Sequence, residues 1–492
     1  MAGSGAVVCK PPNIEHANEK AAKIAFCQAT LIYPANMSTN KLNIVILAAG
    51  KGTRMYSQQP KVLHKLAGRP LLQHVISNAQ QLGPVKTIVI YGFGGEAVPQ
   101  AFPHENIVWV KQSEQLGTGH AVLQALPHLD QDATTLILLG DVPLVNTDSC
   151  RKLLAQTRQL GLLTVKKPDP NGYGRIVRDD AGQVSAIVEH KDATEQQRLI
   201  NEVNTGIIAV QNIKLAAWLE RLTNNNSQGE YYLTDIVAMA VQDGVEVAAE
   251  LAEDEWQVAG VNSKQDLAQL ERIYQQRYAT KLMQAGVTLL DPARLDVRGE
   301  LKAGRDVEID IGCIFEGAVE LGDGVKVGAY SVLKNTVIGA GTVIAPFTHM
   351  EQAKVGHECR IGPYARLRPG TDLASDVHIG NFVELKNSQV AVSSKINHLS
   401  YVGDTTVGKQ VNIGAGTITC NYDGANKFRT VIGDNAFIGS DSQLVAPVTI
   451  GAGATIGAGS TITKDTPEGE LTLSRGRQLT IKGWKRPQKI NK

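Results

Sequence analysis

The 492-residue sequence lacks an excess of either charge, because 49 lysines and arginines stand against 48 aspartates and glutamates, for a formal net charge of +1. This balance gives no electrostatic reason to expect a nucleic-acid or anionic-membrane partner. The sequence also lacks the run of roughly 18 apolar residues that a membrane span needs, so we expect no transmembrane segment. Its six cysteines are scattered without a C-x-x-C pair, which disfavours a disulfide framework or zinc cluster and favours a reducing cytoplasm.

Aromatic residues are also scarce, at 5% of the chain, whereas glycine occurs 48 times. The scarcity disfavours an aromatic-rich β-sandwich, and the glycines favour an architecture with tight, regularly spaced turns. The length allows two or three domains. The patterns below predict an N-terminal extension (1–36), an α/β domain (37–264), a linker helix (265–285, free of Gly and Pro) and a repeat domain (286–492).

Residues 1–36 carry no strong periodicity, and no small-residue cleavage pattern follows their apolar stretch, which argues against a signal peptide. Met37 precedes a short polar stretch and then a clear strand. We therefore expect the functional start at Met37, with 1–36 an upstream translated or appended extension of unknown role.

Short apolar strands alternate with helical segments from Asn43 onward, at 43–47, 86–91, 135–139 and 162–165. This alternation predicts a mostly parallel, doubly wound sheet of Rossmann-like type. Ligands bind such sheets beyond the carboxyl ends of the strands, so the loops that follow strands are the candidate sites.

The first such loop is L-A-A-G-K-G-T-R-M (47–55), followed by Pro60 and Lys61. Its small residues let backbone N–H groups converge on an anion, and Arg54 and Lys61 add cations for phosphate. Taken alone, the loop is also compatible with a glycine turn flanked by exposed basic residues.

The second loop follows T-L-I-L-L, where Gly140 and Asp141 end the strand. A carboxylate there could hold Mg²⁺ between nucleotide phosphates, although an Asp that only caps a turn is the alternative. A third segment, E-Q-L-G-T-G-H (114–120), offers amides and backbone groups to a base edge, and is otherwise an ordinary loop.

With G-Y-G-R-I (172–176), V-E-H-K-D-A (188–193), N-T-G (204–206) and G-E-Y-Y-L-T-D (229–235), these segments resemble the sugar-nucleotide pyrophosphorylases. The resemblance implies Mg²⁺-dependent uridylyl transfer from UTP to a sugar 1-phosphate, helped mainly by positioning and by cations. It places Mg²⁺ ligands at Asp141 and Asn262 and catalytic cations at Arg54 and Lys61. The UTP and sugar positions that it implies are Leu47, Ala48, Gly50, Lys61, Gln112, Gly117, Thr118, Leu139, Gly140, Asp141, Gly174, Glu189, Asn204 and Asn262.

Leu139 departs from this family, in which the equivalent residue is often Tyr. The leucine side chain offers no phenol hydroxyl, so only the backbone of this residue could contact the nucleotide.

Aliphatic or aromatic residues recur at every sixth position through much of the second half, usually followed by a small residue. These positions are Ile309, Phe315, Leu321, Val327, Leu333, Val355, Ile361, Leu367, Leu373, Ile379, Leu385, Ile432, Ile438, Leu444, Ile450, Ile456 and Ile462. A period of six predicts a parallel β-helix in which each hexad forms one side and points its apolar residue inward. A helical alternative is disfavoured, because glycine and β-branched residues at this density are poor helix formers.

The segment 417–430 breaks the period, so we expect a loop that leaves the β-helix. Polar residues at Lys386, His398, Tyr401, Asn412 and Ser440 lie on different coils, and stacking could bring them to one edge. His398 is a candidate general base because imidazole titrates near neutral pH. A hydrogen-bonded surface histidine is the alternative.

The segments 365–370, 380–386, 397–404 and 412–427 resemble the left-handed β-helix acyltransferases that use acetyl-CoA, typically trimers with active sites between subunits. The order of the two halves resembles the bacterial bifunctional enzymes that combine UDP-N-acetylglucosamine pyrophosphorylase and glucosamine-1-phosphate N-acetyltransferase. This resemblance makes 37–264 the uridylyltransferase domain and 286–492 the acetyltransferase domain. It leaves only 1–36 unexplained.

The resemblance implies that His398 is the base and that Glu384 orients it. It places the sugar phosphate at Arg368, Lys386, Tyr401, Asn412 and Lys427. It places acetyl-CoA at Ala415, Asn421, Tyr422, Ser440, Ala458 and Arg475. The implied protein is a cytoplasmic homotrimer that makes UDP-N-acetylglucosamine for cell-envelope synthesis (peptidoglycan and the lipid A of lipopolysaccharide), with small-molecule substrates and no nucleic-acid partner.

Two other interpretations remain open. In the first, the chain is a nucleotidyltransferase whose β-helix serves only assembly or regulation, against which His398 and the 417–430 loop argue. In the second, the chain is a trimeric scaffold that binds sugar nucleotides without turnover, which pyrophosphate release would exclude.

Overall fold

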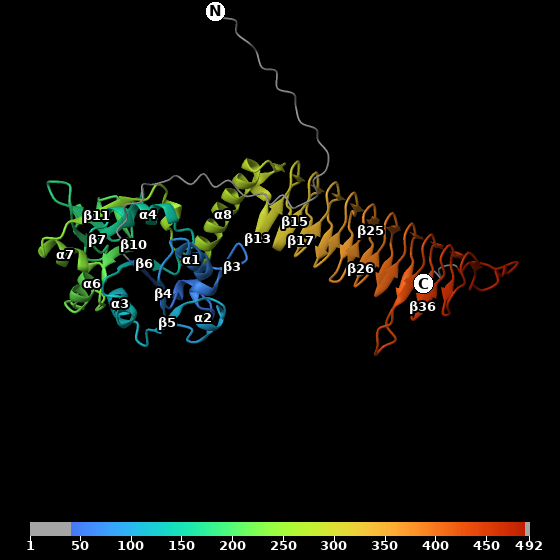
Figure 1. Ribbon diagram of the computed structural model, residues 1–492, viewed down its shortest axis with the longest axis horizontal. Helices are drawn as coiled ribbons and strands as arrows, with labels where there is room; N and C mark the ends of the chain where they lie inside the picture. The colour runs from blue at the N-terminus through green and yellow to red at the C-terminus, as the bar shows by residue number, and fades with distance from the viewer. Residues whose placement is uncertain (1–40, 488–492) are drawn as a thin grey trace, which may run out of the picture. The chain divides into compact units, whose positions relative to one another are not determined.

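The first domain, which begins with β1 at Leu42, is built on a nine-stranded sheet (Figure 1). Its strand order is β11-β7-β10-β6-β1-β4-β5, and β8 and β9 branch from this order. The structure is a computed structural model that describes residues 41–487. The predicted extension at 1–36 lies outside the described residues. The strands are β1 (Leu42–Ala48), β4 (Lys86–Tyr91), β5 (Val108–Lys111), β6 (Thr134–Leu139), β7 (Leu160–Lys166), β8 (Arg175–Arg178), β9 (Val184–Val188), β10 (Glu202–Gln211) and β11 (Val247–Leu251).

The strands expected from the apolar pattern are confirmed as β1, β4, β6 and β7. The sheet is mixed, however, because β10 runs antiparallel between β6 and β7, whereas β6-β1-β4-β5 and β7-β11 pair in parallel. The polar N-T-G segment lies inside β10, where the pairing with β7 shifts register between Asn204 and Ile208. This interruption concealed β10 from the apolar pattern.

Helices cover both faces of this sheet, and successive β1 residues face opposite cores. Ile44 and Ile46 share one core with α1 (Leu71–Gln80), α2 (Ala97–Gln100) and α4 (Thr147–Gln156). Val45 faces the other, which is formed with α3 (Thr118–Ala125), α6 (Asn212–Leu219) and α7 (Asp235–Gln242). A short helix, α5 (Glu195–Arg198), lies before β10. This layering leaves the carboxyl ends of β1 and β6 for the candidate site.

The second part of the chain is a solenoid of parallel strands, arranged as an 11-stranded and a 17-stranded sheet (Figure 1, yellow to red). Equivalent residues on most successive coils lie 17 or 18 positions apart, as in Asp372 with Gln389 and Arg366 with Glu384, whereas Asn412 and Phe437 are separated further by the loop between their coils. Every hexad residue predicted to point inward is at most 4% exposed. The predicted β-helix is therefore confirmed, because its apolar period becomes a continuous internal stack.

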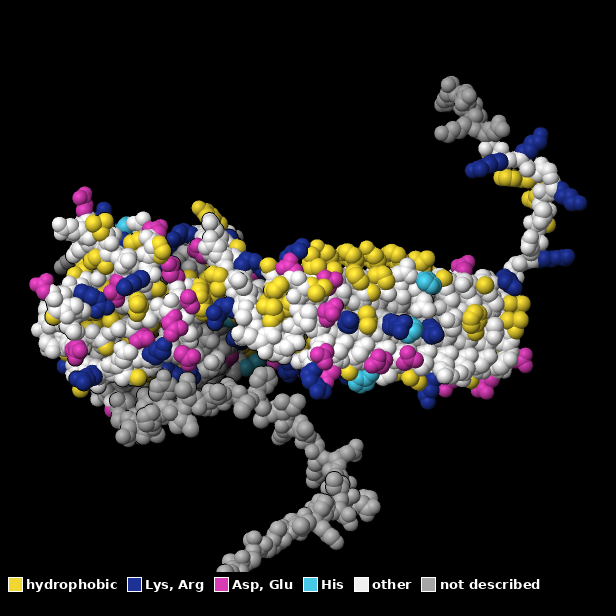
Figure 2. Space-filling model, turned by 90° about the horizontal axis from the view of Figure 1, so that it is seen from above, with side chains coloured by type: hydrophobic (Ala, Val, Ile, Leu, Met, Phe, Trp, Pro, Cys, Tyr) yellow, Lys and Arg dark blue, Asp and Glu magenta, His cyan; other side chains and the backbone are white. Residues whose placement is uncertain are grey.

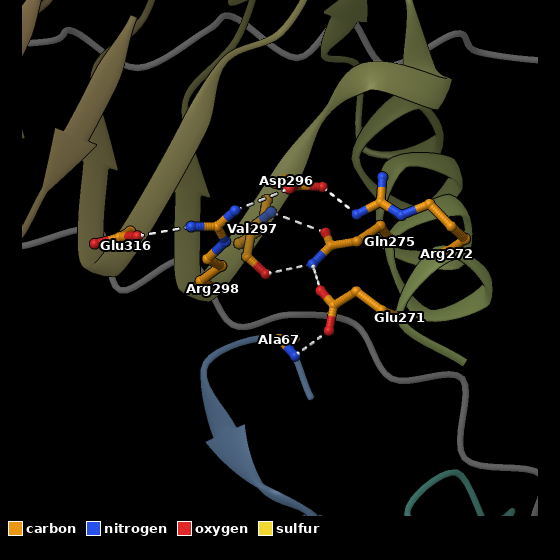
Figure 3. A network of polar contacts seen from close by, with 8 residues as sticks. All are labelled: Ala67, Glu271, Arg272, Gln275, Asp296, Val297, Arg298 and Glu316. Atoms are coloured by element: carbon orange, nitrogen blue, oxygen red, sulfur yellow. Dashed lines mark hydrogen bonds and ion pairs between the residues drawn. The ribbon is translucent and has the colours of Figure 1, made fainter. Parts of the chain in front are cut away.

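Helix α8 (Lys264–Gln284) precedes the solenoid, and a polar network joins it both to the first solenoid strand and to a hairpin of the first domain (Figure 3). The Gln275 side chain exchanges two hydrogen bonds with the backbone of Val297 in β13 (Asp296–Ala303), at 2.8 and 2.9 Å. Glu271 accepts from Gln275 and from the backbone N–H of Ala67, at 2.8 and 2.7 Å. Ala67 lies in the hairpin of β2 (Lys65–Leu66) and β3 (Arg69–Pro70) that follows Lys61. Within residues 41–487, no helix is both long enough and apolar enough to cross a membrane.

Candidate functional sites

Lys61, Asp141 and Asn262 converge at the carboxyl end of the first sheet, although the sequence separates them widely. The Lys61 ammonium donates to the Asp141 carboxylate and, at 3.2 Å, to Oδ1 of Asn262. The backbone N–H of Val261 donates to the Asp141 carbonyl at 2.9 Å, which fixes Asn262 beside Asp141. Three residues that sequence reasoning assigned to phosphate and metal thus form one cluster.

Gly52 allows this cluster to form. Its φ of +60° lies in the left-handed region, and a Cβ added there would lie 2.7 Å from the Cβ of Lys61. The glycine loop and Lys61 can therefore approach each other only without that atom. Arg54, on the short helix Thr53–Met55, is exposed.

The oxygens of Asp141 and Asn262 fit a hard divalent cation. Both already point at one positive charge, the Lys61 ammonium. A carboxylate and an amide oxygen are ligands that Mg²⁺ accepts, and substrate phosphates and water usually complete its octahedron. The chemistry of this donor set therefore agrees with the metal position implied by the sequence.

The predicted uridine-binding segment 114–120 contacts a second motif, 229–235. Gln112 follows β5, is buried, and donates to the Gly117 carbonyl at 3.2 Å. Gly117, with φ +112°, leaves no room for a Cβ, which would lie 2.6 Å from the carbonyl oxygen of Tyr231. The Thr118 hydroxyl accepts from the backbone N–H of Leu233 at 3.1 Å. The segments 114–120 and 229–235 thus pack against each other.

Leu139 stands at the position where sugar-nucleotide pyrophosphorylases often have Tyr, and its side chain lies close to Gly206. It ends β6 beside Leu47, whose carbonyl accepts from the backbone N–H of Gly140 at 2.9 Å. A Cβ on Gly206, which has φ +80°, would lie 2.8 Å from Cδ1 of Leu139. The side chain of Leu139 therefore fills space against the N-T-G turn. A Cβ on Gly140 would meet Ala48 at 3.1 Å, whereas Gly50 faces open space.

The three residues predicted to hold the N-acetylated sugar lie together. The backbone N–H of Asn204 donates to the Gly174 carbonyl at 2.8 Å, and a Cβ on Gly174 would lie 3.3 Å from Oε1 of Glu189. Burial raises the pKa of Glu189, and the Thr234 hydroxyl, which donates to Oε1 at 3.2 Å, offsets part of this rise. Residues from three separate motifs thus lie next to one another.

In the solenoid, His398 contacts a residue one coil earlier. Its Nδ1 lies 2.9 Å from Oδ1 of Asn381, which is its register partner between β25 (His378–Asn381) and β28 (Lys395–His398). Glu384 was expected to orient His398, but its carboxylate instead accepts from Arg368 at 2.8 Å. The structure places Asn381, and not Glu384, at the imidazole.

Side chains of alternating charge follow one face of the solenoid, at equivalent positions on successive coils. The members, in order, are Arg298, Glu316, Lys334, Glu351, Arg368 and Lys386. Neighbours pair at 3.0 Å between Arg298 and Glu316 and at 2.9 Å between Lys334 and Glu351. The alternation ends with two adjacent cations, Arg368 and Lys386.

A third cation, Lys427, joins this pair from the irregular loop. That loop spans 421–429, between β32 (Ile418–Cys420) and β33 (Thr430–Ile432), and leaves the stack of coils (Figure 1). Lys427, within hydrogen-bonding reach, lowers the pKa of Lys386, and burial and the charge of Arg368 lower it further. Like charges that gather around one ammonium group favour an anionic ligand between them. This is the position predicted for the sugar phosphate.

Two other residues predicted for the sugar phosphate lie in different sheets of the solenoid. Tyr401, on β29 (Tyr401–Gly403), is the register partner of Glu384 in the 17-stranded sheet. Asn412 lies on β31 (Asn412–Ile413), which pairs with β28, the strand of His398, in the 11-stranded sheet. Its register partner on β28 is Lys395. Both side chains are half-buried.

The small residues predicted to contact acetyl-CoA form a column. Register pairs link Lys395, Asn412, Phe437 and Thr455 on successive coils. Three positions after each of these stand His398, Ala415, Ser440 and Ala458. The Arg475 guanidinium donates to the Ala458 carbonyl at 3.0 Å. Stacking thus aligns the candidate base with three acetyl-CoA positions, whereas Tyr422 is exposed on the loop and Asn421 is buried at its base.

One sequence family matches the first domain, and a second matches part of the solenoid. Residues 44–288 match the MobA-like NTP transferase domain, and residues 429–464 match the bacterial transferase hexapeptide family, with six repeats. The chain is 69% identical to the "Bifunctional protein GlmU" of Methylobacillus flagellatus, over 92% of this chain and 99% of that protein. It is 63% identical to the protein of the same name in Nitrosospira multiformis, over 92% and 98%. For the Chromobacterium violaceum protein the identity is 58%, over 92% and 99%.

The chain belongs to the family of bifunctional GlmU proteins. It is therefore an enzyme with two transferase activities, with uridylyl transfer in the NTP transferase domain and acetyl transfer in the hexapeptide-repeat domain.

Sequence reasoning missed two polar residues of the second site, Asn381 and Asp404. Each contacts a predicted residue 17 positions away, Asn381 with His398 and Asp404 with Asn421. That spacing is one coil of the solenoid, so polar residues 17 apart were the signal that could have found them.

Proposed function

We propose that the solenoid domain acetylates glucosamine 1-phosphate with acetyl-CoA, and that the N-terminal domain then uridylylates the product with UTP and Mg²⁺ in the cytoplasm. The observation that carries this proposal is the cluster of Arg368, Lys386 and Lys427, which suits a sugar phosphate, on the same solenoid as the contact between His398 and Asn381. Two substrate sites in one chain would let the first product feed the second reaction.

In the acetyl transfer, the sugar amine attacks the thioester carbonyl carbon. When Nδ1 of His398 carries a proton, it donates to Asn381, and Nε2 keeps a lone pair. Nε2 takes the proton that the amine loses, the carbon–sulfur bond breaks, and the leaving thiolate is protonated as free coenzyme A. The cations of the cluster hold the sugar phosphate, which fixes the amine in place.

In the uridylyl transfer, an oxygen of the sugar phosphate attacks the α-phosphorus of UTP in line, and the bond to the β-phosphate breaks to release pyrophosphate. Asp141 and Asn262 would hold Mg²⁺, which would supply positive charge to offset that of the phosphates. Lys61 and Arg54 position phosphate oxygens, while Gly174, Glu189 and Asn204 line the sugar position.

The test is mass spectrometry of the products formed from glucosamine 1-phosphate, acetyl-CoA, UTP and Mg²⁺. We expect UDP-N-acetylglucosamine, with N-acetylglucosamine 1-phosphate accumulating when UTP is omitted. Uridylylated glucosamine without an acetyl group would contradict the proposed order. The absence of any acetylated product would contradict the proposed substrate of the solenoid domain.

We also propose that the chain is a homotrimer joined through its solenoid. Figure 2 shows a dense row of apolar side chains along one edge of the solenoid. Tyr330, Phe347, Tyr364 and Phe382 stack with ring centroids 5.5, 5.0 and 5.2 Å apart, and each is about half exposed. Contiguous exposed apolar surface of this kind marks an interface. A second copy fits it best, because Phe382 and Leu399 adjoin Asn381 and His398, where the resemblance puts a site between subunits.

Phe347→Glu should convert the trimer to monomers, because the added carboxylate would have to be desolvated in the interface. Light scattering after size-exclusion chromatography measures the change. Acetyl transfer should fall with trimer content, whereas uridylyl transfer should stay within about twofold. Ile213→Glu, at an exposed apolar position on α6, is the matched control and should leave the mass unchanged. A trimer of unaltered stability in Phe347→Glu would rule out this edge.

A further inference from the structure

Asp404 is a buried carboxylate beside two of the three cations of the solenoid site, Lys386 and Lys427. The residue is 9% exposed, and its carboxylate accepts from Nδ2 of Asn387 at 2.6 Å and from Nδ2 of Asn421. A buried charge persists only when hydrogen bonds and opposite charges compensate for lost solvation. Asp404 has both, since Lys386 and Lys427 are its charged neighbours.

The backbone of Asp404 connects the same elements. Its N–H donates to the Lys386 carbonyl at 2.9 Å, and its own carbonyl accepts from the N–H of Thr430 at 3.2 Å. Asn421 is the first residue of the 421–429 loop, and Thr430 directly follows the loop. Asp404 therefore contacts both ends of the loop that carries Lys427. Its φ of +48° places this turn in the left-handed region, which Asp tolerates better than most residues.

The charge of Asp404 complements the cations. Burial raises its pKa, but the amides of Asn387 and Asn421 and the charges of Lys427 and Lys386 outweigh burial and hold that pKa below its usual value. The ionised carboxylate in turn raises the pKa of Lys386, against the lowering by Lys427 and Arg368. One acid thus offsets part of the repulsion among the cations before a phosphate binds.

We propose that Asp404 is a positioning residue of the acetyl-transfer site, which fixes the 421–429 loop so that Lys427 lies beside Lys386 as a preformed phosphate-binding pair. The inference rests on the proposed sugar-phosphate site. Asp404 itself touches neither the amine nor the thioester, and it acts through the two lysines and the loop. Preorganisation of this kind lowers the cost of ordering the loop when the sugar phosphate binds.

The first test is Asp404→Asn, which keeps the size of the side chain and removes its charge. Loss of a hydrogen bond to a charged group is worth about 10- to 100-fold. We therefore expect KM for glucosamine 1-phosphate to rise by about that factor while kcat of acetyl transfer stays within about threefold, because the contact between His398 and Asn381 is untouched. Uridylyl transfer by the same polypeptide should be unchanged.

Asp376→Asn is the matched control. Asp376 has φ +56°, and its N–H donates to the carbonyl of His357 on the preceding coil at 2.9 Å, which is the backbone arrangement of Asp404. Asp376 is exposed, and it is not a register partner of any of the three cations. In Asp376→Asn we expect KM for glucosamine 1-phosphate and kcat of acetyl transfer to match those of the unmodified protein.

The outcomes separate this inference from the proposed function. Lys386→Ala should raise KM for glucosamine 1-phosphate, and an unchanged KM would refute the phosphate site itself. If Lys386→Ala raises KM but Asp404→Asn does not, only the role of Asp404 is overturned. A fall in kcat with unchanged KM would also overturn it.

A folding defect in Asp404→Asn would still leave the inference testable through Asn387→Ala, which removes one amide partner and keeps the carboxylate. That variant should raise the same KM by about 3- to 10-fold, which is less than for Asp404→Asn because the carboxylate keeps its charge and its bond from Asn421. An unchanged KM in a folded Asn387→Ala protein would contradict the inference.

Discussion

His398→Ala should lower the rate of coenzyme A release by about 100- to 10,000-fold, the range that a positioned general base contributes. The sugar amine is a poor nucleophile while it keeps its proton, and in the structure the His398 imidazole is held at Nδ1 by Asn381, which leaves Nε2 available. The loss should appear in kcat, since the cation cluster that binds the phosphate is intact. A thiol-reactive dye follows coenzyme A release directly.

Two controls make this result interpretable. Uridylyl transfer by the same variant should be unchanged, because no residue of that site lies in the solenoid. His357→Ala removes another exposed solenoid histidine, whose Nδ1 accepts from the Ala340 backbone at 3.0 Å, and should leave acetyl transfer within about twofold. Undiminished coenzyme A release in His398→Ala would return the solenoid to a role in assembly or regulation alone.

The parts of the fold that could be predicted are those written in local periods. Ile432, Ile438 and Leu444 recur every six residues, and all are buried because the period places each on an inward-facing side. Strands β1 and β6 were predictable for a similar reason, since continuous apolar runs mark strands buried on both faces. By contrast, β10 contains the polar turn at Gly206 and was not recognised.

The side-chain partners within the sites could not be predicted, because they depend on register between coils. Glu384 was assigned to His398, but stacking puts Arg366 opposite Glu384, which also accepts from Arg368, and puts Asn381 opposite His398. Arg366 and Glu384 are 18 residues apart, whereas Asn381 and His398 are 17 apart. A change of one residue per coil therefore decides which side chains meet. The motif resemblance implied which residues to consider, whereas their contacts follow only from the way the coils stack.

The same limit applies to the first site, where Lys61, Asp141 and Asn262 come from three distant segments. The sequence showed that each follows or precedes a regular element, but not that one ammonium contacts both oxygens. The capping of α8 completes this arrangement, since the Asp266 carboxylate accepts from the backbone N–H groups of Asn262 and Ser263, each at 2.9 Å. The position of Asn262 is thus a property of the helix that follows it.

Asp141→Ala should lower uridylyl transfer by about 100-fold or more, because a bound metal ion contributes several kcal/mol of charge stabilisation to phosphoryl chemistry. Asn262→Ala should have a smaller effect in the same direction, since it removes a neutral ligand. Pyrophosphate release measures the rate, and acetyl transfer in each variant reports that the chain is folded. Asp148→Ala, at an exposed acid on α4 that pairs with Arg151, is the control and should leave the rate unchanged.

The Mg²⁺ dependence distinguishes a ligand from a simple partner of Lys61. If Asp141 and Asn262 hold the metal, both variants should require more Mg²⁺ for half-maximal rate, and binding of Mg²⁺ with UTP should weaken in calorimetry. Lys61→Ala removes the ammonium that contacts both oxygens, so it should lower the rate without raising the Mg²⁺ requirement, because the two ligands then lose a competing cation. An unchanged Mg²⁺ requirement in Asp141→Ala would show that this carboxylate serves Lys61 and not the metal.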